Sequence, residues 1–277
     1  MIVKPLKASF GATITDVKLA TISDDDFTQL SNAWLDHALL IFPGQHLSKA
    51  EQIAFAERFG PLELECVPIS NMTKEGKVRG DDDVMKVLKG NMDWHCDSTY
   101  MPVMAKGAVF SAHTVPEAGG ETGFADMRAA YDSLPDNTRQ QVQKLSAHHS
   151  LRHSQAKVGH DHSDKSEYSG YGFHDGDVPL RPLVKQHPDT GKPSLVIGRH
   201  AYGIPGLSEI ESEQLLSQLL TDACQEDRVY YHHWQAGDVV LWDNRCLLHR
   251  ACPWDLSEPR VMYHSRIAGD PGTEAAS

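Results

Sequence analysis

Short extended segments recur along the chain from residue 106 onward, and they constrain its fold more than any other feature. Four of them are rich in Val, Ile and aromatic residues and are bounded by Gly or Pro: 106–115, 193–201, 238–244 and 260–267. Few helical patterns separate them. Strands arranged in this way usually build an antiparallel sandwich or barrel. We therefore predict a mainly β fold.

The sequence also predicts four helices. Two begin with a capping box, in which a Ser is followed three residues later by a Glu and then by apolar residues at helical spacing. A third has a weaker N-cap, and a fourth shows only periodicity. Their signals are Ser48 with Glu51, Ser208 with Glu211, Ser23 with Asp26, and a stretch over residues 136–145.

One segment differs from the rest of the chain. Residues 147–177 are rich in His, Gly, Ser and Asp and show little apolar periodicity. A loop this long between ordered elements is usually functional or disordered. The chain shows no repeat, low-complexity tract or linker. We therefore expect a single domain, residues 1–277, in which 147–177 forms a lid or insertion at a site.

Composition narrows the classes of function. The formal net charge of −12 argues against nonspecific binding of nucleic acid, which needs a basic surface. The five cysteines are odd in number, irregularly spaced and without a CxxC pair, which is typical of a reducing compartment. There is no apolar leader and no run of about 18 apolar residues for a membrane span. A cytoplasmic protein is expected, and a homo-oligomer stays open.

A His-x-Asp pair carries the first chemical signal. Side chains alternate faces along an extended segment, so His and Asp point the same way while the residue between them points away. The chain has three such pairs: His95–Asp97, His162–Asp164 and His187–Asp189. The third runs into Thr190–Gly191, which favours a hairpin turn. The second lies in a polar loop. The first follows Trp94 and precedes the strand-rich region, where a buried site is expected.

A third metal ligand is expected far along the chain. His249 follows an apolar strand and a short turn, 154 positions after His95 (249 − 95). Two imidazoles, one carboxylate and open coordination positions make up the facial triad of non-haem Fe(II) oxygenases. For His95 and Asp97 alone, a structural hydrogen-bonded pair is an equal alternative, and His249 shifts the balance toward iron.

These residues resemble the motif of the taurine dioxygenase and 2,4-dichlorophenoxyacetate dioxygenase family. The matching positions are His95, Asp97, Thr122, His249 and Arg260. The likeness covers nearly the whole chain and is most specific in segments 90–102, 119–134 and 237–251. These segments are similar to the branch that cleaves aryloxypropionate herbicides, particularly the one acting on the S-enantiomer. A hydroxylase of N-acylated amino acids belongs to the same branch.

The resemblance implies a double-stranded β-helix, or jelly roll, with flanking helices. It implies Fe(II) held by His95, Asp97 and His249, with 2-oxoglutarate and O2 as co-substrates. The C1 carboxylate and 2-oxo group of oxoglutarate would chelate the metal. Arg260 would then pair with the distant C5 carboxylate, and Thr122 would donate a further hydrogen bond to it. The reaction would release succinate and CO2.

The expected substrate is a small carboxylate, such as a phenoxypropionate whose ether is cleaved after hydroxylation beside the ether oxygen. Four residues are candidate contacts: Asn91, Arg199, Met262 and His264. His264 occupies the position of a second, substrate-binding Arg in the taurine enzyme, so that enzyme's basic clamp is not expected here. Cys96 fills the x position and should face away from the metal. Met262 is equally compatible with plain core, and Arg199 with a surface ion pair.

Three alternatives remain at this stage. One is hydroxylation of an N-acyl (N-succinyl) amino acid or another small anion by the same machinery. Another is a metal-binding jelly roll without catalysis, although Arg260 and Thr122 would then have no purpose. A hydrolase ranks last, because the sequence has no GxSxG elbow and no nucleophile–base pair.

Overall fold

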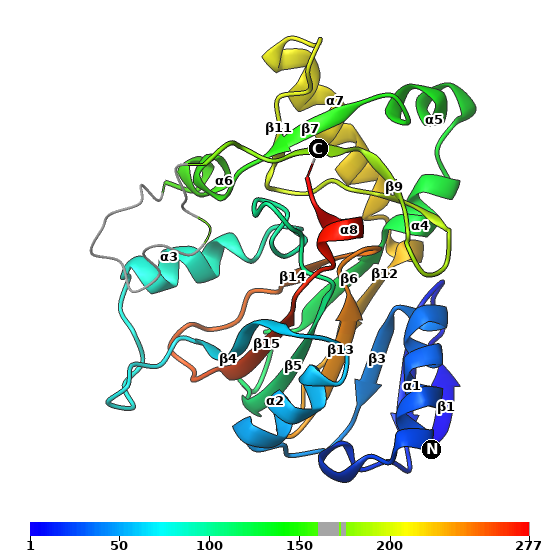
Figure 1. The fold of residues 1–277 in the computed structure, drawn as a ribbon. Helices are drawn as coiled ribbons and strands as arrows, with labels where there is room; N and C mark the ends of the chain where they lie inside the picture. Colours follow the sequence, from blue (N-terminus) through cyan, green and yellow to red (C-terminus); the bar gives the residue numbers. More distant parts are fainter. Residues whose placement is uncertain (160–171, 173–175, 277) are drawn as a thin grey trace.

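The computed structural model of the chain describes residues 1–159, 172 and 176–276, and its centre is a pair of facing antiparallel sheets (Figure 1). The larger sheet has seven strands in the order β1-β2-β3-β13-β5-β15-β4. Their bounds are Ile2–Pro5 (β1), Ala12–Thr15 (β2), Leu39–Phe42 (β3), Val239–Asp243 (β13), Gly107–Thr114 (β5), Val261–Ile267 (β15) and Leu62–Ser70 (β4). All its pairings are antiparallel except β2 with β3.

The smaller facing sheet has three strands in the order β12-β6-β14. They span Val229–His232 (β12), Thr122–Asp126 (β6) and Leu247–Ala251 (β14). A second three-stranded sheet and a two-stranded hairpin complete the described strands: Ala201–Tyr202 (β11), Ser146–His149 (β7), Leu180–Pro182 (β8), Pro193–Leu195 (β10) and Val184–Gln186 (β9). This arrangement matches the predicted jelly roll.

Alternation along the strands explains why the two sheets face each other. In β13, Val240 and Trp242 point into the layer between the sheets, where they meet Phe110 of β5 and Phe124 of β6. Val239 and Leu241 point to the opposite face. Because β13 is buried on both faces, its sequence is a continuous apolar run rather than an alternating one.

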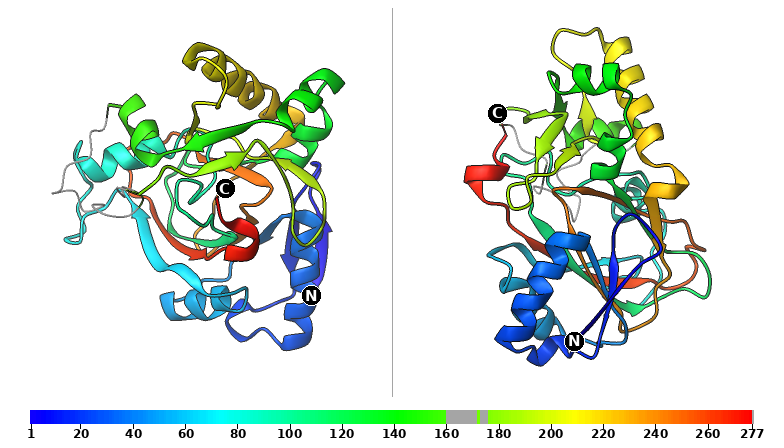
Figure 2. Two further views of the ribbon diagram at one scale, coloured as in Figure 1. Left: turned by 45° about the horizontal axis from the view of Figure 1, so that its top comes forward. Right: turned by 90° about the vertical axis from the view of Figure 1, so that its right-hand side faces the viewer.

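Helices cover the outer faces of both sheets (Figure 2). Trp34 of α1 and Phe55 of α2 pack on the larger sheet, and Leu216 and Leu219 of α7 pack in the cluster that includes Leu248 of the smaller one. The helices span Asp24–His37 (α1), Lys49–Glu57 (α2), Asp83–Gly90 (α3), Met127–Asp132 (α4), Asp136–Val142 (α5), Leu151–Lys157 (α6), Glu209–Ala223 (α7) and Pro271–Glu274 (α8), with 3-10 turns at Leu19–Thr21 and Glu226–Arg228. None of the described helices is long and apolar enough to cross a membrane.

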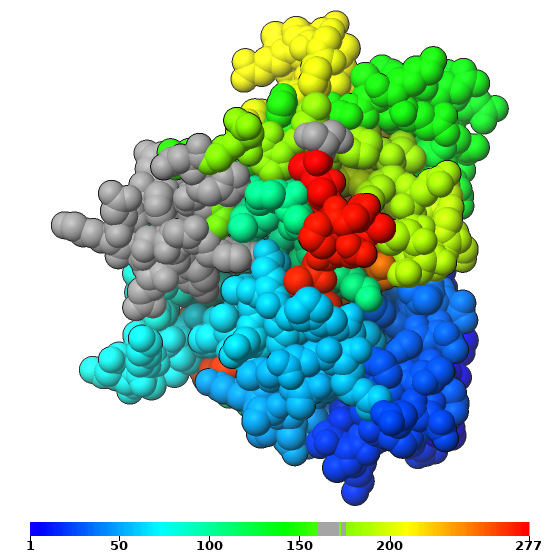
Figure 3. Space-filling model, in the orientation of Figure 1, coloured from blue at the N-terminus to red at the C-terminus, as the bar shows by residue number. Residues whose placement is uncertain are grey.

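The four predicted helices are confirmed as α1, α2, α5 and α7. Both capping boxes form as expected, and Ser23 accepts a hydrogen bond from the backbone N–H of Asp26. The C-terminal α8 lies on the surface between the two halves of the molecule (Figure 3). It is held there by the ion pair of Glu274 with Lys185 and by a hydrogen bond from Arg181 to the carbonyl of Glu274.

Two predicted segments differ from the structure. The strand expected over 193–201 ends at Leu195, because Gly198 has φ +122° and lies against the backbone of Trp94 and His95. The stretch expected to be a loop from 147 instead contains the end of β7 and all of α6. The rest of that stretch, including His162 and Asp164, lies largely outside the described residues.

Candidate metal centre

Backbone pairing brings two of the predicted ligands together. His95 follows α3, and His249 lies on β14. Their N–H groups donate to each other's carbonyls at 2.9 and 2.8 Å, which makes an isolated antiparallel bridge. The two imidazole rings therefore lie side by side, with centroids 4.2 Å apart. Two residues that are 154 positions apart in the sequence are therefore direct neighbours in the structure.

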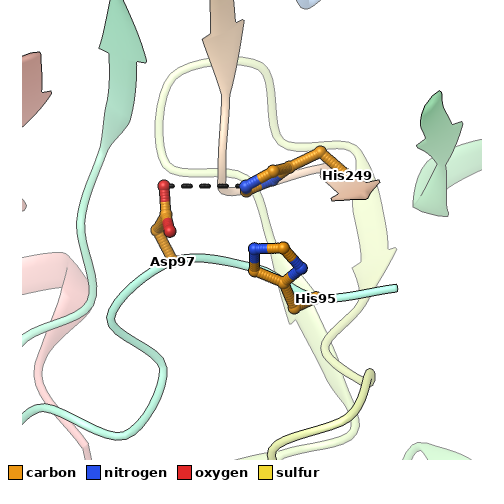
Figure 4. A group of neighbouring side chains, drawn as sticks. All are labelled: His95, Asp97 and His249. Atoms are coloured by element: carbon orange, nitrogen blue, oxygen red, sulfur yellow. Dashed lines mark ion pairs between the residues drawn. The ribbon is translucent and has the colours of Figure 1, made fainter. Parts of the chain in front are cut away.

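Asp97 joins the two histidines from two residues beyond His95 (Figure 4). Its Oδ2 lies 3.8 Å from Nε2 of His249, and one ligand atom from each of the three residues lies within 4.8 Å of the others. The residue between, Cys96, points the other way, and its thiol donates to the carbonyl of Asn244 at 3.0 Å. The alternation expected for His-x-Asp is therefore present.

The protonation states suit a metal ion. Burial and the neighbouring His249 lower the pKa of His95 to about 3, and burial lowers the pKa of His249 to about 4. Burial raises the pKa of Asp97, but Arg266 and the nearby histidines lower it by more than burial raises it. The pKa of Asp97 therefore lies well below its ordinary value. Two neutral imidazoles and a carboxylate are the forms that bind metals.

The hydrogen bonds also suit a metal ion. Nδ1 of His95 lies 2.8 Å from the carbonyl of Asp93, an acceptor that fixes the proton on Nδ1 and leaves Nε2 as a ligand. Asp97 Oδ2 is buried without a hydrogen-bond partner in the described structure. A buried carboxylate oxygen without a partner is costly, and a cation at this point would satisfy it. The residues present therefore fit Fe2+.

Arg260 is a buried cation that has no carboxylate beside it in the described part of the chain. Its side chain is 3% exposed, and its Nε and Nη2 donate only to the carbonyl of Gly120, at 3.3 and 3.1 Å. Within the described residues no carboxylate lies within ion-pair distance of it. Burial lowers its pKa to about 10, which still leaves it charged at neutral pH. Such a group is expensive unless an anionic ligand pairs with it.

Thr122 is oriented to donate toward the same space. Its Oγ1 accepts a hydrogen bond from Nε1 of Trp234 at 2.9 Å, which leaves its own hydroxyl proton for another acceptor. Thr122 and Arg260 both line the cavity that contains the three candidate ligands. The residues predicted to bind the C5 carboxylate of oxoglutarate and those predicted to bind the metal therefore line one cavity.

This cavity, of about 140 Å3, is mainly apolar beyond its polar centre. Its apolar and aromatic wall residues are Leu64, Val67, Ile69, Val87, Tyr100, Phe110, Leu151, Trp242 and Ala251. Leu151 and Gln155 come from α6, within the segment predicted as an insertion at the site. Sequence reasoning did not identify these two residues or His200, because helix α6 and the turn at Gly198 that bring them to the cavity leave no recognisable pattern.

The predicted substrate contacts divide into two groups. Asn91 and His264 line the cavity. Met262 does not, because it is fully buried in the core between the sheets, so the plain-core interpretation holds for it. Arg199 lines a neighbouring cavity of about 260 Å3 instead. It is not in a surface ion pair: its Nη2 donates to the carbonyl of Ser154, and its Nε and Nη1 have no hydrogen-bond partner in the described structure.

The pair His187–Asp189 lies in a hairpin, as predicted. Strands β9 and β10 flank it, and Nδ1 of His187 accepts from the N–H groups of Asp189 and Thr190. Its Nε2 therefore donates to Asp243 at 3.0 Å, and Arg245 covers both oxygens of that carboxylate. His187, Asp243 and Cys246 lie close enough to hold a metal. However, both carboxylate oxygens of Asp243 already accept hydrogen bonds from His187 and Arg245.

His187→Ala should lower the free energy of unfolding without affecting the metal. The substitution removes the buried hydrogen bond to Asp243 and the two that Nδ1 accepts from the turn, which should cost at least about 1–3 kcal/mol. Urea unfolding measures this loss, and Fe2+ affinity and oxoglutarate turnover should stay at wild-type values. A loss of iron in this variant would move the metal to the His187 cluster.

Comparisons with known proteins agree with this geometry. A family model described as taurine catabolism dioxygenase TauD, TfdA family matches residues 2–266. The chain is 60% identical to an (S)-phenoxypropionate/alpha-ketoglutarate-dioxygenase of Sphingobium herbicidovorans, over 99% of this chain and 97% of the relative. It is 35% identical to an alpha-ketoglutarate-dependent 2,4-dichlorophenoxyacetate dioxygenase of Cupriavidus pinatubonensis, over 98% of each chain.

A solved structure shows the same fold. The crystal structure of AAD-2 in complex with Mn(II) and N-oxalylglycine superposes with a TM-score of 0.91. That protein is 33% identical, and the match covers 100% of this chain and 99% of the other. A metal ion and a small dicarboxylate-like molecule are therefore accommodated by this fold.

Proposed function

This chain belongs to the taurine catabolism dioxygenase TauD, TfdA family, and we propose that it cleaves a small aryloxyalkanoate of the 2-phenoxypropionate type. As a member of the family it is an alpha-ketoglutarate-dependent dioxygenase that uses Fe(II) and O2. The observation that carries the substrate proposal is the 60% identity, over nearly the whole of both chains, to a relative named for (S)-phenoxypropionate.

In the proposed assignment, His95, Asp97 and His249 hold the iron, and Arg260 with Thr122 binds the C5 carboxylate of oxoglutarate. Bound iron supplies the redox chemistry by which oxoglutarate and O2 become succinate, CO2 and a hydroxyl group on the substrate. Burial of the ligands, each under 10% exposed, keeps bulk water from this chemistry. Arg260 fixes the far end of oxoglutarate, so the 2-oxo end reaches the three ligands in one orientation.

The apolar wall supports an aromatic substrate body. Phe110, Leu64 and Ile69 offer contacts to a ring, and Asn91 and His264 offer polar contacts in the same cavity. Arg199 stays a candidate for the substrate carboxylate, because its guanidinium lies against Gly90, next to Asn91, and two of its nitrogens have no hydrogen-bond partner among the described residues. Hydroxylation of the carbon between carboxylate and ether oxygen gives a hemiketal, which separates into a phenol and pyruvate. No hydrolytic residue is required.

A turnover assay tests the substrate. Both enantiomers of 2-phenoxypropionate, an N-succinyl amino acid and taurine are each added with Fe2+, ascorbate and oxoglutarate, and succinate and phenol are measured. We expect the S-enantiomer to yield phenol and succinate in equal amounts, and taurine to yield neither. Turnover of the N-succinyl amino acid without turnover of either phenoxypropionate would assign the other activity of this branch. Succinate release coupled to taurine alone would overturn the proposed substrate and leave the iron site intact.

A further inference from the structure

The two oxygens of Asp97 have different surroundings. Oδ1 accepts a hydrogen bond from Nη2 of Arg266 at 2.9 Å. Oδ2 has no hydrogen-bond partner in the described structure and faces Nε2 of His249 and of His264, at 3.8 and 3.4 Å. One oxygen is therefore held by a charge-assisted hydrogen bond, while the other is left toward the space between the candidate ligands.

Arg266 is itself fixed in place. Its side chain is buried, at 8% exposed, and its Nη1 donates to Oγ of Ser98 at 3.2 Å. Ser98 in turn donates to Glu63 at 2.7 Å, and it has φ +58°, a conformation rare for a residue other than Gly. The residue after Asp97 therefore turns the chain so that its hydroxyl meets the same guanidinium.

The strand that carries Arg266 is irregular at this point. The register of β15 against β4 shifts on both sides of Arg266, so the regular ladder is interrupted where this side chain enters the site. Burying a guanidinium is costly, and an irregularity in a strand can redirect a side chain next to an active site. A feature of this kind beside a candidate ligand indicates a role at the site rather than in general stability.

We propose that Arg266 is a positioning residue that reserves Oδ1 of Asp97, so that Oδ2 alone is available to the metal. This inference rests on the proposed function. A carboxylate that binds through both oxygens takes an extra coordination position. The oxoacid needs two positions and O2 needs one. By holding Oδ1, Arg266 keeps these positions open, and its effect should appear in oxoglutarate binding more than in metal binding.

Co2+ substituted for iron provides the test, because its visible absorption weakens as the coordination number rises. Arg266→Met should still bind Co2+, but with weaker absorption than wild type. Its affinity for oxoglutarate, titrated through the same absorption, should fall about 10- to 100-fold, as when other outer partners of metal ligands are removed. Arg266→Lys keeps the charge without the planar fork and should give a smaller change in the same direction. If the Met variant does not fold, the Lys variant decides.

Arg128→Met is the matched control. Arg128 is also buried and is paired with a buried carboxylate, Asp126, but it lies outside the cavity wall. This variant should lose stability and keep both the Co2+ spectrum and the oxoglutarate affinity.

The other possible results contradict either the positioning role of Arg266 or the proposed function. Wild-type spectrum and oxoglutarate affinity in the Arg266 variants would overturn the positioning role. So would a folded Arg266→Met protein that binds no Co2+, because Arg266 would then be needed for the ligand set itself. Failure of the wild-type protein to bind Co2+ would instead contradict the proposed function.

Discussion

Replacing any one of His95, Asp97 or His249 with Ala should abolish oxoglutarate turnover while the protein stays folded. The three residues offer ligand atoms within 4.8 Å of one another, and the side chains are buried in neutral or anionic forms suited to a metal. Loss of an outer partner of a ligand usually costs 10- to 100-fold, so loss of a ligand itself should cost at least about 100-fold in Fe2+ affinity. Metal titration and succinate release measure the two effects.

The three variants should differ in stability. Asp97→Ala removes the carboxylate that accepts a charge-assisted hydrogen bond from the buried Arg266, so it should be the least stable of the three. Asp97→Asn keeps the shape and a carbonyl oxygen for Arg266, and it separates loss of the metal from loss of the fold. His187→Ala is the control, since it also removes a buried imidazole. Wild-type iron affinity in the His95 or His249 variant would exclude that residue as a ligand.

Much of the fold could be predicted from local sequence signals. Capping boxes at Ser48 and Ser208 set helix starts, because their hydrogen bonds are formed within four residues. The apolar run of β13 predicted a strand, and its burial on both faces explains why the run does not alternate. Helix α3, which precedes Asn91 and His95, was missed, because it is only eight residues long and its N-cap Asp82 stands between two other aspartates, which hides the start signal.

Only those site residues could be predicted whose residue type and spacing are themselves required for metal binding. His-x-Asp works because alternation is a property of any extended segment, and the structure shows Cys96 turned away as expected. Choosing among the three pairs depended on context, and His187 was separable because HPDTG specifies a turn. The contacts of Met262 and Arg199 were not predictable. Strand alternation predicted that Met262 shares a face with Arg260 and His264. Its side chain packs in the core between the sheets and does not line the cavity.

Arg260→Ala should raise the apparent KM for oxoglutarate by about 30-fold or more. In the wild-type protein, Arg260 is buried and charged, and its described hydrogen bonds go only to the carbonyl of Gly120. An arriving carboxylate would therefore gain a pair without breaking an existing ion pair. A lost buried pair of this kind costs roughly 2–5 kcal/mol. Arg260→Lys should recover part of the affinity, because it restores the charge without the bidentate fork.

An oxoacid without the C5 carboxylate separates this role from general damage. 2-Oxopentanoate carries a methyl group where oxoglutarate has that carboxylate. The wild-type protein should bind oxoglutarate much more tightly than 2-oxopentanoate, and Arg260→Ala should lose most of that preference while it keeps its Fe2+ affinity. If instead the variant still discriminates as the wild type does, the C5 carboxylate pairs with another cation. Arg250, which also lines the cavity, would then be the residue to change next.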